Sequence, residues 1–272
     1  MKFFKYQGCG NDYVYIDCLD QNIEIENPNE LAKKISDRNF GVGSDGLILI
    51  LPSSSLADAK MRIFNSDGSE AEMCGNGIRC VAKYIFDNKK SFNENITKIE
   101  TLAGIKILEL ISYKNKVSKI KVNMGHPEFL NSFFLDKRTF KDISHNCGTY
   151  ISMGNPHFVV LCENIDFFDI KNISRKIQNL PYFKNGVNVD FVKIESQYSI
   201  KVRVFERGSG ETLSCGTGAC AAAVAAISNG FISSDKLIVK LKGGELLVEY
   251  TDDLVYMTGD ATLVFEGEYY CD

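Results

Sequence analysis

The sequence predicts an α+β fold of two similar domains, each a mixed β-sheet wrapped around a central helix. Three observations predict it. Short β-rich runs dominate the chain, helical patterns are few, and the two halves repeat one another over most of the 272 residues. A repeat of this length is much longer than the roughly 20–50 residues of a solenoid repeat. It therefore indicates two related domains, and we expect a functional site between them.

The repeat is clearest around two cysteines. The stretches "RIFNSDGSEAEMCGNGIRC" at 62–80 and "RVFERGSGETLSCGTGACA" at 203–221 share residues at a constant offset of 141 positions. Two shorter pairs follow at similar offsets: "GND" at 10–12 with "GNP" at 154–156, and "GVGSD" at 41–45 with "GVNVD" at 186–190. Cys74 and Cys215 thus occupy matched positions in the two halves.

In the first half, the strands are expected where β-branched and aromatic residues alternate between turn residues. These runs lie at 3–7, 13–17, 46–51, 60–65, 105–112 and 119–124. The stretch 27–39 has the polar and apolar spacing of an amphipathic surface helix. A second helix is expected after Cys74, because Ile78, Val81, Ala82 and Ile85 form a wide apolar face.

The second half repeats this order. Its β-rich runs lie at 149–153, 157–162, 189–194, 200–206, 236–241, 245–250 and 261–270, and the stretch 169–180 is the counterpart of the first surface helix. The helix after Cys215 is alanine-rich and ends near Asn229 and Gly230. With no polar face, it should be buried by its strands. We place the domains at 1–118, with the last strand at about 262–272, and at 119–261.

Composition limits the class of protein. The chain is 44% hydrophobic and 24% charged with a formal net charge of −4, and its basic residues are scattered rather than gathered into a stripe. This argues against a nucleic-acid partner. The N-terminus lacks the apolar core of a signal peptide and no segment has the length of a membrane span, so we expect no membrane partner and a cytoplasmic protein.

Nine cysteines and three histidines raise the question of a metal or disulfide role. An odd number of cysteines without a Cys-x-x-Cys pair fits neither a disulfide framework nor a zinc site, and the spacing of His126, His145 and His157 matches no common metal site. We expect reduced thiols and no metal. A single cysteine is usually a small buried hydrophobe. That interpretation is assigned to Cys9, Cys18, Cys80, Cys147, Cys162, Cys220 and Cys271.

Cys74 and Cys215 are different, because each is followed by Gly-x-Gly where a strand should turn into a helix. Helix N-termini present free N–H groups, which lower a thiol pKa and also bind anions such as a carboxylate. Two thiols facing one carbon suit inversion of a C–H stereocentre, in which one acts as base and the other as acid. Helix amides would stabilise the deprotonated intermediate. The sequence shows no convincing lysine context for pyridoxal phosphate, and no cofactor is expected.

The chain resembles the diaminopimelate epimerase family in "GCGNDYVYID", "RNFGVGSDGLILI", "MGNPHFVV", "GVNVDFVKI" and both cysteine stretches, in that order. The resemblance covers almost the whole chain. It implies a cofactor-independent isomerase that interconverts LL- and meso-2,6-diaminopimelate by two-cysteine proton transfer, on the route to lysine and peptidoglycan precursors. It also implies that the final strand returns to the first domain and that the protein is a homodimer.

The resemblance assigns roles to particular residues. Cys74 and Cys215 match the acid and base thiols, and His157 and Glu206 match positions that tune them. The substrate-binding positions are matched by Asn11, Asn65, Asn155, Asn188, Glu206 and Arg207, and the amides that hold the reacting carboxylate by Gly75, Asn76, Gly216 and Thr217. Judged singly, Asn11, Asn155 and Asn188 could instead be turn residues, Glu206 and Arg207 a solvated ion pair, and His157 a packed strand residue.

Two departures from the family pattern stand out. Gly46 occupies a position where some relatives have glutamine, and Cys9 one where a small or aliphatic residue is usual. Rival hypotheses are proline racemase or hydroxyproline epimerase, which typically have histidine where this chain has Asn76, and phenazine-biosynthesis isomerases, which lack the paired cysteines. An anion-binding or redox module with a regulatory Cys74–Cys215 disulfide is an alternative of another class.

Overall fold

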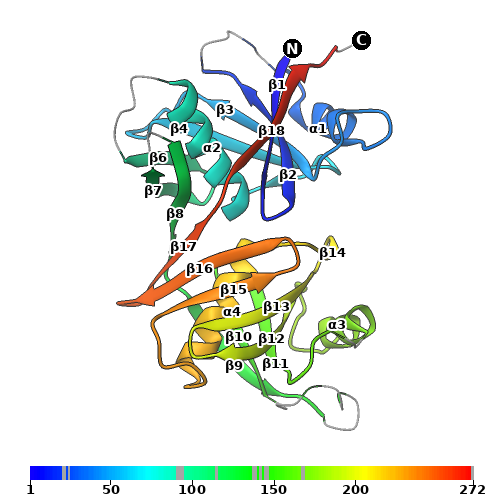
Figure 1. Cartoon of the computed structure of the whole chain (residues 1–272). Helices are drawn as coiled ribbons and strands as arrows, with labels where there is room; N and C mark the ends of the chain where they lie inside the picture. Colours follow the sequence, from blue (N-terminus) through cyan, green and yellow to red (C-terminus); the bar gives the residue numbers. More distant parts are fainter. Residues whose placement is uncertain are drawn as a thin grey trace. The chain divides into compact units, whose positions relative to one another are not determined.

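The computed structural model describes residues 1–19, 23, 25–89, 95–113, 116–136, 140, 143, 147–166 and 169–270. The chain forms two compact units. Unit 1 comprises Met1–Asn123 and Thr258–Asp272, and unit 2 comprises Met124–Met257. Figure 1 follows the chain from the N-terminal strands of unit 1 through unit 2 and back to a last strand in unit 1.

Unit 1 consists of β-strands and two helices. In chain order its elements are β1 (Lys2–Gly8), β2 (Asn11–Asp17), α1 (Pro28–Ser36), β3 (Gly46–Leu51), β4 (Ala59–Asn65), β5 (Glu70–Ala71), α2 (Gly75–Asn88), β6 (Ile96–Thr101), β7 (Gly104–Tyr113), β8 (Lys116–Gly125) and, at the end of the chain, β18 (Thr262–Glu268). Antiparallel pairs β18–β1–β2 continue into the parallel pair β2–β3, and the parallel pair β4–β6 follows the antiparallel pair β3–β4. The sheet is therefore mixed, as predicted.

Unit 2 has the same order of elements, except that its outer strand comes first, whereas the outer strand β18 of unit 1 comes last. They are β9 (Glu128–Phe134), β10 (Cys147–Ser152), β11 (Pro156–Leu161), α3 (Ile170–Gln178), β12 (Asn188–Ser196), β13 (Ser199–Glu206), β14 (Gly210–Glu211), α4 (Gly216–Ser228), β15 (Lys236–Leu241), β16 (Gly244–Thr251) and β17 (Leu254–Gly259). Pairings match those of unit 1: β9–β10–β11 are antiparallel, β11–β12 parallel, β12–β13 antiparallel and β13–β15 parallel. The internal repeat of the sequence is thus a repeat of topology, and the predicted α+β class is confirmed.

Strand alternation gives each sheet two faces. In β12, Val189 and Phe191 join the apolar cluster that includes Ile173 and Ile177 of α3. Asp190, the residue between them, faces the other way and lies against α4. In unit 1 the same alternation sends alternate residues of β2 and β3 into a cluster with α1. Each sheet therefore has a small amphipathic helix on one face and the helix after the cysteine on the other.

The helix after each cysteine is buried, as the sequence predicts. Residues Ala219–Ala226 of α4 are all buried, and α4 contacts strands β10, β11, β12, β13, β15 and β16 (Figure 1). Alanine side chains let these strands approach closely, while each buried methyl contributes on the order of 0.8 kcal/mol. Helix α2 buries Ile78, Val81 and Ile85 against β1, β2, β6 and β7.

Helices α1 and α3 are shorter than the stretches 27–39 and 169–180 predicted for them. Asn27 caps α1 by accepting a hydrogen bond from the Glu30 N–H at 3.2 Å, and Asp169 caps α3 through the Asn172 N–H at 3.1 Å. Helix α1 ends where the backbone of Asp37 becomes extended. Helix α3 ends shortly before Pro181, which disfavours helical geometry in the residue that precedes it.

The polar stretch around Lys119 is a hairpin rather than a linker. Strands β7 and β8 pair with Tyr113 opposite Lys116, so the polar residues there belong to one antiparallel ladder inside unit 1. The boundary after residue 118 in the sequence analysis therefore differs from the division after Asn123, and the return at about 262 differs from Thr258.

The sequence match of "GVGSD" with "GVNVD" does not align residues that occupy equivalent positions in the two units. Residue Tyr13 pairs with Gly46 across β2 and β3, and His157 pairs with Asn188 across β11 and β12. This register makes Gly46 the equivalent of Asn188, and Ile48 the equivalent of Asp190. Asp45, which matches Asp190 in the sequence motif, lies before β3 instead.

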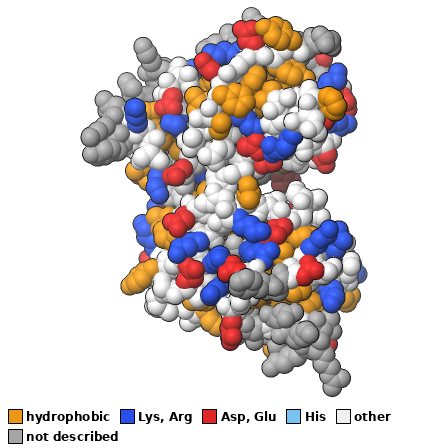
Figure 2. Space-filling view, turned by 45° about the vertical axis from the view of Figure 1, so that its right-hand side comes forward, with side chains coloured by type: hydrophobic (Ala, Val, Ile, Leu, Met, Phe, Trp, Pro, Cys, Tyr) orange, Lys and Arg blue, Asp and Glu red, His pale blue; other side chains and the backbone are white. Residues whose placement is uncertain are grey.

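Surface charges are mixed on the face that Figure 2 shows, where lysine and arginine side chains lie among aspartate and glutamate. In the described ranges, the structure contains no helix whose length and apolar character would let it span a membrane.

Candidate functional site

Cys74 is the N-cap of α2. Its backbone is extended (φ −136°, ψ 118°), and its Sγ accepts a hydrogen bond from the Gly77 N–H at 3.4 Å. A Cβ on Gly77 would lie 2.7 Å from Cδ1 of Ile48, so the glycine lets the helix start against the strand. The sequence prediction of a thiol at a strand-to-helix turn is confirmed.

Asn11 lies next to this thiol. Its Oδ1 is 3.4 Å from Cys74 Sγ and 3.4 Å from Asn76 Nδ2, while its Nδ2 donates to Asp45 Oδ2 at 2.8 Å. Asn11 is therefore oriented by its neighbours and is more than a turn residue. Asp45 is the partner that fixes which end of the amide faces the sulfur.

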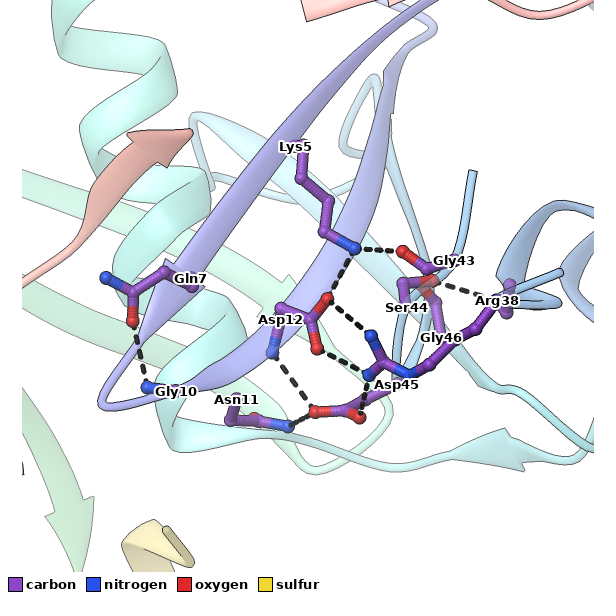
Figure 3. A network of polar contacts seen from close by, with 11 residues as sticks. Lys5, Gln7, Gly10, Asn11, Asp12, Arg38, Gly43, Ser44, Asp45 and Gly46 are labelled. Carbon is purple, nitrogen blue, oxygen red and sulfur yellow. Dashed lines mark hydrogen bonds and ion pairs between the residues drawn. The ribbon is translucent and has the colours of Figure 1, made fainter. Parts of the chain in front are cut away.

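Asp45 belongs to a network of charges that Figure 3 shows. Arg38 Nη2 lies 2.9 Å from Asp45 Oδ1 and 2.9 Å from Asp12 Oδ1, and Lys5 forms an ion pair with Asp12. Lys5 is buried, and it also donates to the Gly43 carbonyl. Paired and hydrogen-bonded charges of this kind hold the start of β2 in one position.

The side chain of Arg79 stabilises the first turn of α2 by hydrogen bonds. It is completely buried, and it donates to the Gly75 carbonyl at 3.2 Å, to Asn76 Oδ1 at 2.9 Å and to the Asp260 carbonyl at 3.2 Å. Since Asn76 Oδ1 is bound to Arg79, Asn76 Nδ2 is left to face Asn11. The amides of Gly75 and Asn76 are thereby held in a fixed turn.

Cys215 is the N-cap of α4, with the same extended backbone (φ −128°, ψ 113°). Its Sγ lies 3.4 Å from Thr217 Oγ1. That hydroxyl is in turn 3.0 Å from His157 Nε2, and His157 Nδ1 is 2.8 Å from Asp190 Oδ2. His157 is therefore part of a polar chain that reaches the thiol.

The other predicted residues of unit 2 surround this chain. Asn155 Oδ1 lies 3.2 Å from His157 Nε2, and Asn188 Nδ2 lies 3.4 Å from the same nitrogen. Asn188 is buried, and its Oδ1 accepts from the Arg207 N–H at 3.0 Å. Glu206 accepts from the Thr212 hydroxyl at 2.7 Å.

Arg207 is exposed, and its Nη1 donates to the Asn185 carbonyl at 3.1 Å. It lines a pocket of about 510 Å³ together with Glu206 and the basic residues Lys171 and Arg175 of α3. The alternative in which Glu206 and Arg207 form a solvated ion pair with each other is not supported, because the contacts of these side chains are with Thr212 and Asn185.

Burial reverses the expected direction of the thiol pKa values. Desolvation raises the pKa of Cys74 above its ordinary value, and the N–H groups of Gly77 and Asn76 only partly oppose it. The pKa of Cys215 is raised further, by burial and then by the nearby carboxylates of Glu206 and Asp190. Burial also raises the pKa of Glu206 and of Asp190. The helix N-terminus therefore does not by itself produce a thiolate.

Asn65, Gly46 and Cys9 are further residues of unit 1 that the sequence analysis named. Asn65 pairs with Gly46 across β4 and β3, and its Nδ2 donates to Ser69 Oγ at 3.0 Å. A Cβ on Gly46 would lie 2.2 Å from the Phe64 carbonyl oxygen, so a longer side chain there requires the backbone to move. Cys9 is buried in the turn between β1 and β2 with φ 55°.

The sequence reasoning missed several residues of these networks, among them Asp190, Asp45 and Arg79. Asp190 and Asp45 lie inside the repeated motifs, but the sequence around an aspartate in a strand-rich stretch does not indicate which residue it binds. In the described ranges, no group of three or more His, Cys, Asp or Glu side chains could hold a metal ion. His145 and Cys271 lie outside the described residues.

Comparisons with known proteins identify the family to which the chain belongs. The family model described as "Diaminopimelate epimerase" matches residues 3–130 and 149–264. A diaminopimelate epimerase of Acetivibrio thermocellus is 50% identical over 98% of this chain and 98% of its own, and one of Methanococcus maripaludis is 49% identical over 98% and 99%.

Among solved structures, a phenazine biosynthesis protein of the PhzF family from Bacillus anthracis superposes with a TM-score of 0.75. It covers 100% of this chain and 99% of its own at 20% identity. At that identity the likeness shows the fold alone.

Proposed function

We propose, since the chain belongs to the diaminopimelate epimerase family, that it is an isomerase that interconverts LL- and meso-2,6-diaminopimelate. Lysine and peptidoglycan precursor synthesis is the route such an activity serves. The substrate is accordingly a small molecule with two amino-acid ends.

One observation carries this proposal. Two units of the same topology each present a cysteine as the N-cap of the buried central helix, at φ −136° and ψ 118° for Cys74 and φ −128° and ψ 113° for Cys215. A packing role for a cysteine would not require the same backbone geometry and the same Gly-x-Gly in both units. A reaction that needs one acid and one base does require a matched pair of titratable groups.

The chemistry uses one thiolate and one thiol. The thiolate removes the α-proton from one face of the carbon, and the thiol returns a proton to the opposite face, after which the roles are exchanged. Helix amides at Gly75 and Asn76, and at Gly216 and Thr217, would hold the reacting carboxylate and stabilise the charge that develops on it.

Recognition of the distal end would fall to polar side chains outside the first turns of α2 and α4. A distal ammonium needs acceptors and a distal carboxylate needs donors. Glu206 supplies the first and Arg207 the second, and the set is completed by Asn11, Asn65, Asn155 and Asn188. Glu206 and Arg207 have Asn65 and Ser66 as their counterparts in the repeat. This difference would let one end be recognised while the other reacts.

The test is proton NMR of LL-diaminopimelate with reduced protein in deuterated water, without added cofactor. Conversion to the meso form with deuterium at an α-carbon is the expected result. Cys74→Ala and Cys215→Ala should each abolish conversion, because each removes an acid or base that no other group replaces.

Cys147→Ala is the matched control, since Cys147 is an exposed free cysteine of β10 and not the buried one that the sequence analysis expected. It should convert the substrate at the wild-type rate. A folded, reduced protein that leaves diaminopimelate unchanged would reject the proposal, and activity on proline or hydroxyproline would then favour the racemase relatives.

We further propose a cytoplasmic homodimer, on the family resemblance and on the chemistry of the two thiols. Reduced thiols are required for the acid and base roles, which suits a reducing compartment. Light scattering on the purified protein should give twice the 30.4 kDa chain mass. A mass of one chain at working concentration would contradict the dimer without affecting the proposed activity.

A further inference from the structure

The feature that the proposed function leaves unexplained is a buried carboxylate behind His157. Asp190 is completely buried in β12, and its Oδ2 lies 2.8 Å from His157 Nδ1. Within the described part of the chain, its Oδ1 has no hydrogen-bond partner. A half-satisfied buried carboxylate destabilises the fold, so its presence calls for a functional reason.

The fold makes room for this carboxylate in one unit only. A Cβ on Gly218 of α4 would lie 2.8 Å from Asp190 Oδ1. At the equivalent place in unit 1, a Cβ on Gly77 would meet Cδ1 of Ile48 instead. The apolar residue shows that the fold itself does not need a carboxylate here.

His157 connects this carboxylate to the thiol. Its Nε2 lies 3.0 Å from Thr217 Oγ1, which lies 3.4 Å from Cys215 Sγ. Around Nε2 there is an amide oxygen from Asn155 and an amide nitrogen from Asn188. Both the protonated and the neutral imidazole therefore find partners, which is what a group that stores a proton requires.

We propose that Asp190 is a positioning residue that holds His157 as the proton store of Cys215, with the Thr217 hydroxyl as the relay. This inference rests on the proposed function and adds the group that makes Cys215 ready to act as base.

The step balances as a proton transfer. The S–H proton of Cys215 passes to Thr217 Oγ1 as the Thr217 O–H proton passes to His157 Nε2. The products are a thiolate, an unchanged hydroxyl and an imidazolium whose Nδ1–H donates to the Asp190 carboxylate. Asp190 keeps Nδ1 protonated, so that Nε2 is the nitrogen that faces the hydroxyl.

The two units differ in this respect. The equivalents of His157, Asp190 and Thr217 in unit 1 are Tyr13, Ile48 and Asn76. None of these three side chains accepts a proton near neutral pH, since burial raises the pKa of Tyr13 well above its usual range. The proton store thus belongs to Cys215 and not to Cys74.

Glu206 is the competing acceptor, because it also faces Cys215 from β13. The two possibilities predict opposite effects of Asp190→Asn. If Glu206 or simple electrostatics governs the thiol, loss of the Asp190 charge makes the Cys215 thiolate easier to form. If His157 stores the proton, the same loss weakens the imidazolium and makes the thiolate harder to form.

The experiment measures iodoacetamide alkylation of each cysteine against pH, with peptide mass spectrometry to separate Cys215 from Cys74. In Asp190→Asn and in Thr217→Val, the midpoint for Cys215 should rise by about one pH unit, a roughly tenfold lower rate at pH 7. Thr217→Ser keeps the hydroxyl and should retain the wild-type midpoint. The Cys74 midpoint in the same samples should stay unchanged, which also reports an intact fold.

In the same two variants, the midpoint of the acidic limb in the pH profile of kcat/KM for diaminopimelate should rise by a similar amount. A Cys215 midpoint that falls in Asp190→Asn, or that is unaffected in Thr217→Val, overturns the relay. Alkylation needs no substrate, so the two proposals fail separately. Turnover without the midpoint shift rejects the proton store alone, and absence of turnover rejects the proposed activity.

Discussion

Replacing Arg79 by methionine should destabilise unit 1 more than any surface change of the same kind. Arg79 is completely buried, and its guanidinium donates to the Gly75 and Asp260 carbonyls and to Asn76 Oδ1. Methionine has a similar length and no donor. A hydrogen bond to a charged group contributes about 1.5–3 kcal/mol, so the gross loss is about 5–9 kcal/mol. Removal of a buried charge recovers several kcal/mol, which leaves about 3–5 kcal/mol of net destabilisation.

The assay must report on each unit, because a chain of two units need not unfold in one step. Hydrogen exchange across a urea series, read from peptides of α2 and α4, provides this. With an m value of about 1.5–2 kcal/mol/M for a unit of this size, the α2 midpoint should fall by about 2 M. The α4 midpoint should stay within error of the wild type.

Arg62→Met is the matched control. Arg62 lies in the same unit, but it is partly exposed and paired with Glu70 at 2.7 Å, so its loss should cost about 1 kcal/mol or less. If Arg79→Met shifted the α2 midpoint no more than Arg62→Met, the three acceptors would be satisfied without the guanidinium. The account of how the first turn of α2 is held would then be refuted.

Two further predictions concern the same sites. Burial raises the pKa of Glu206 above its ordinary value. Between the ordinary and the raised pKa, the folded state therefore binds more protons than the unfolded state. In that pH window the stability of unit 2 falls as pH rises. Glu206→Gln should remove that fall, measured as α4 urea midpoints from about pH 4.5 upward; parallel pH dependences in both proteins would contradict it. Gly46→Ala places a Cβ 2.2 Å from the Phe64 carbonyl oxygen and should destabilise unit 1 by about 1–3 kcal/mol. Gly208→Ala, where a Cβ meets nothing within 4 Å, should change stability by less than about 0.5 kcal/mol in thermal denaturation, and equal effects of the two would refute the steric argument.

The internal repeat and the positions of the two cysteines could be predicted from the sequence because each depends only on short segments of the chain. Alternation of apolar residues predicts the strands, and the alanine-rich stretch after Cys215 has no polar face to expose. A cysteine followed by Gly-x-Gly after a strand indicates a helix N-terminus without knowledge of the rest of the chain. These features decided the fold class and the positions of Cys74 and Cys215.

The partners of those cysteines depended on tertiary structure, because strand register is not readable from one motif. The match of "GVGSD" with "GVNVD" pairs Asp45 with Asp190, yet the register makes Ile48 the equivalent of Asp190. Only the parallel pair β11–β12 brings Asp190 to His157, 33 residues earlier in the chain. The direction of the thiol pKa values was likewise decided by burial, which the local helix signal does not contain.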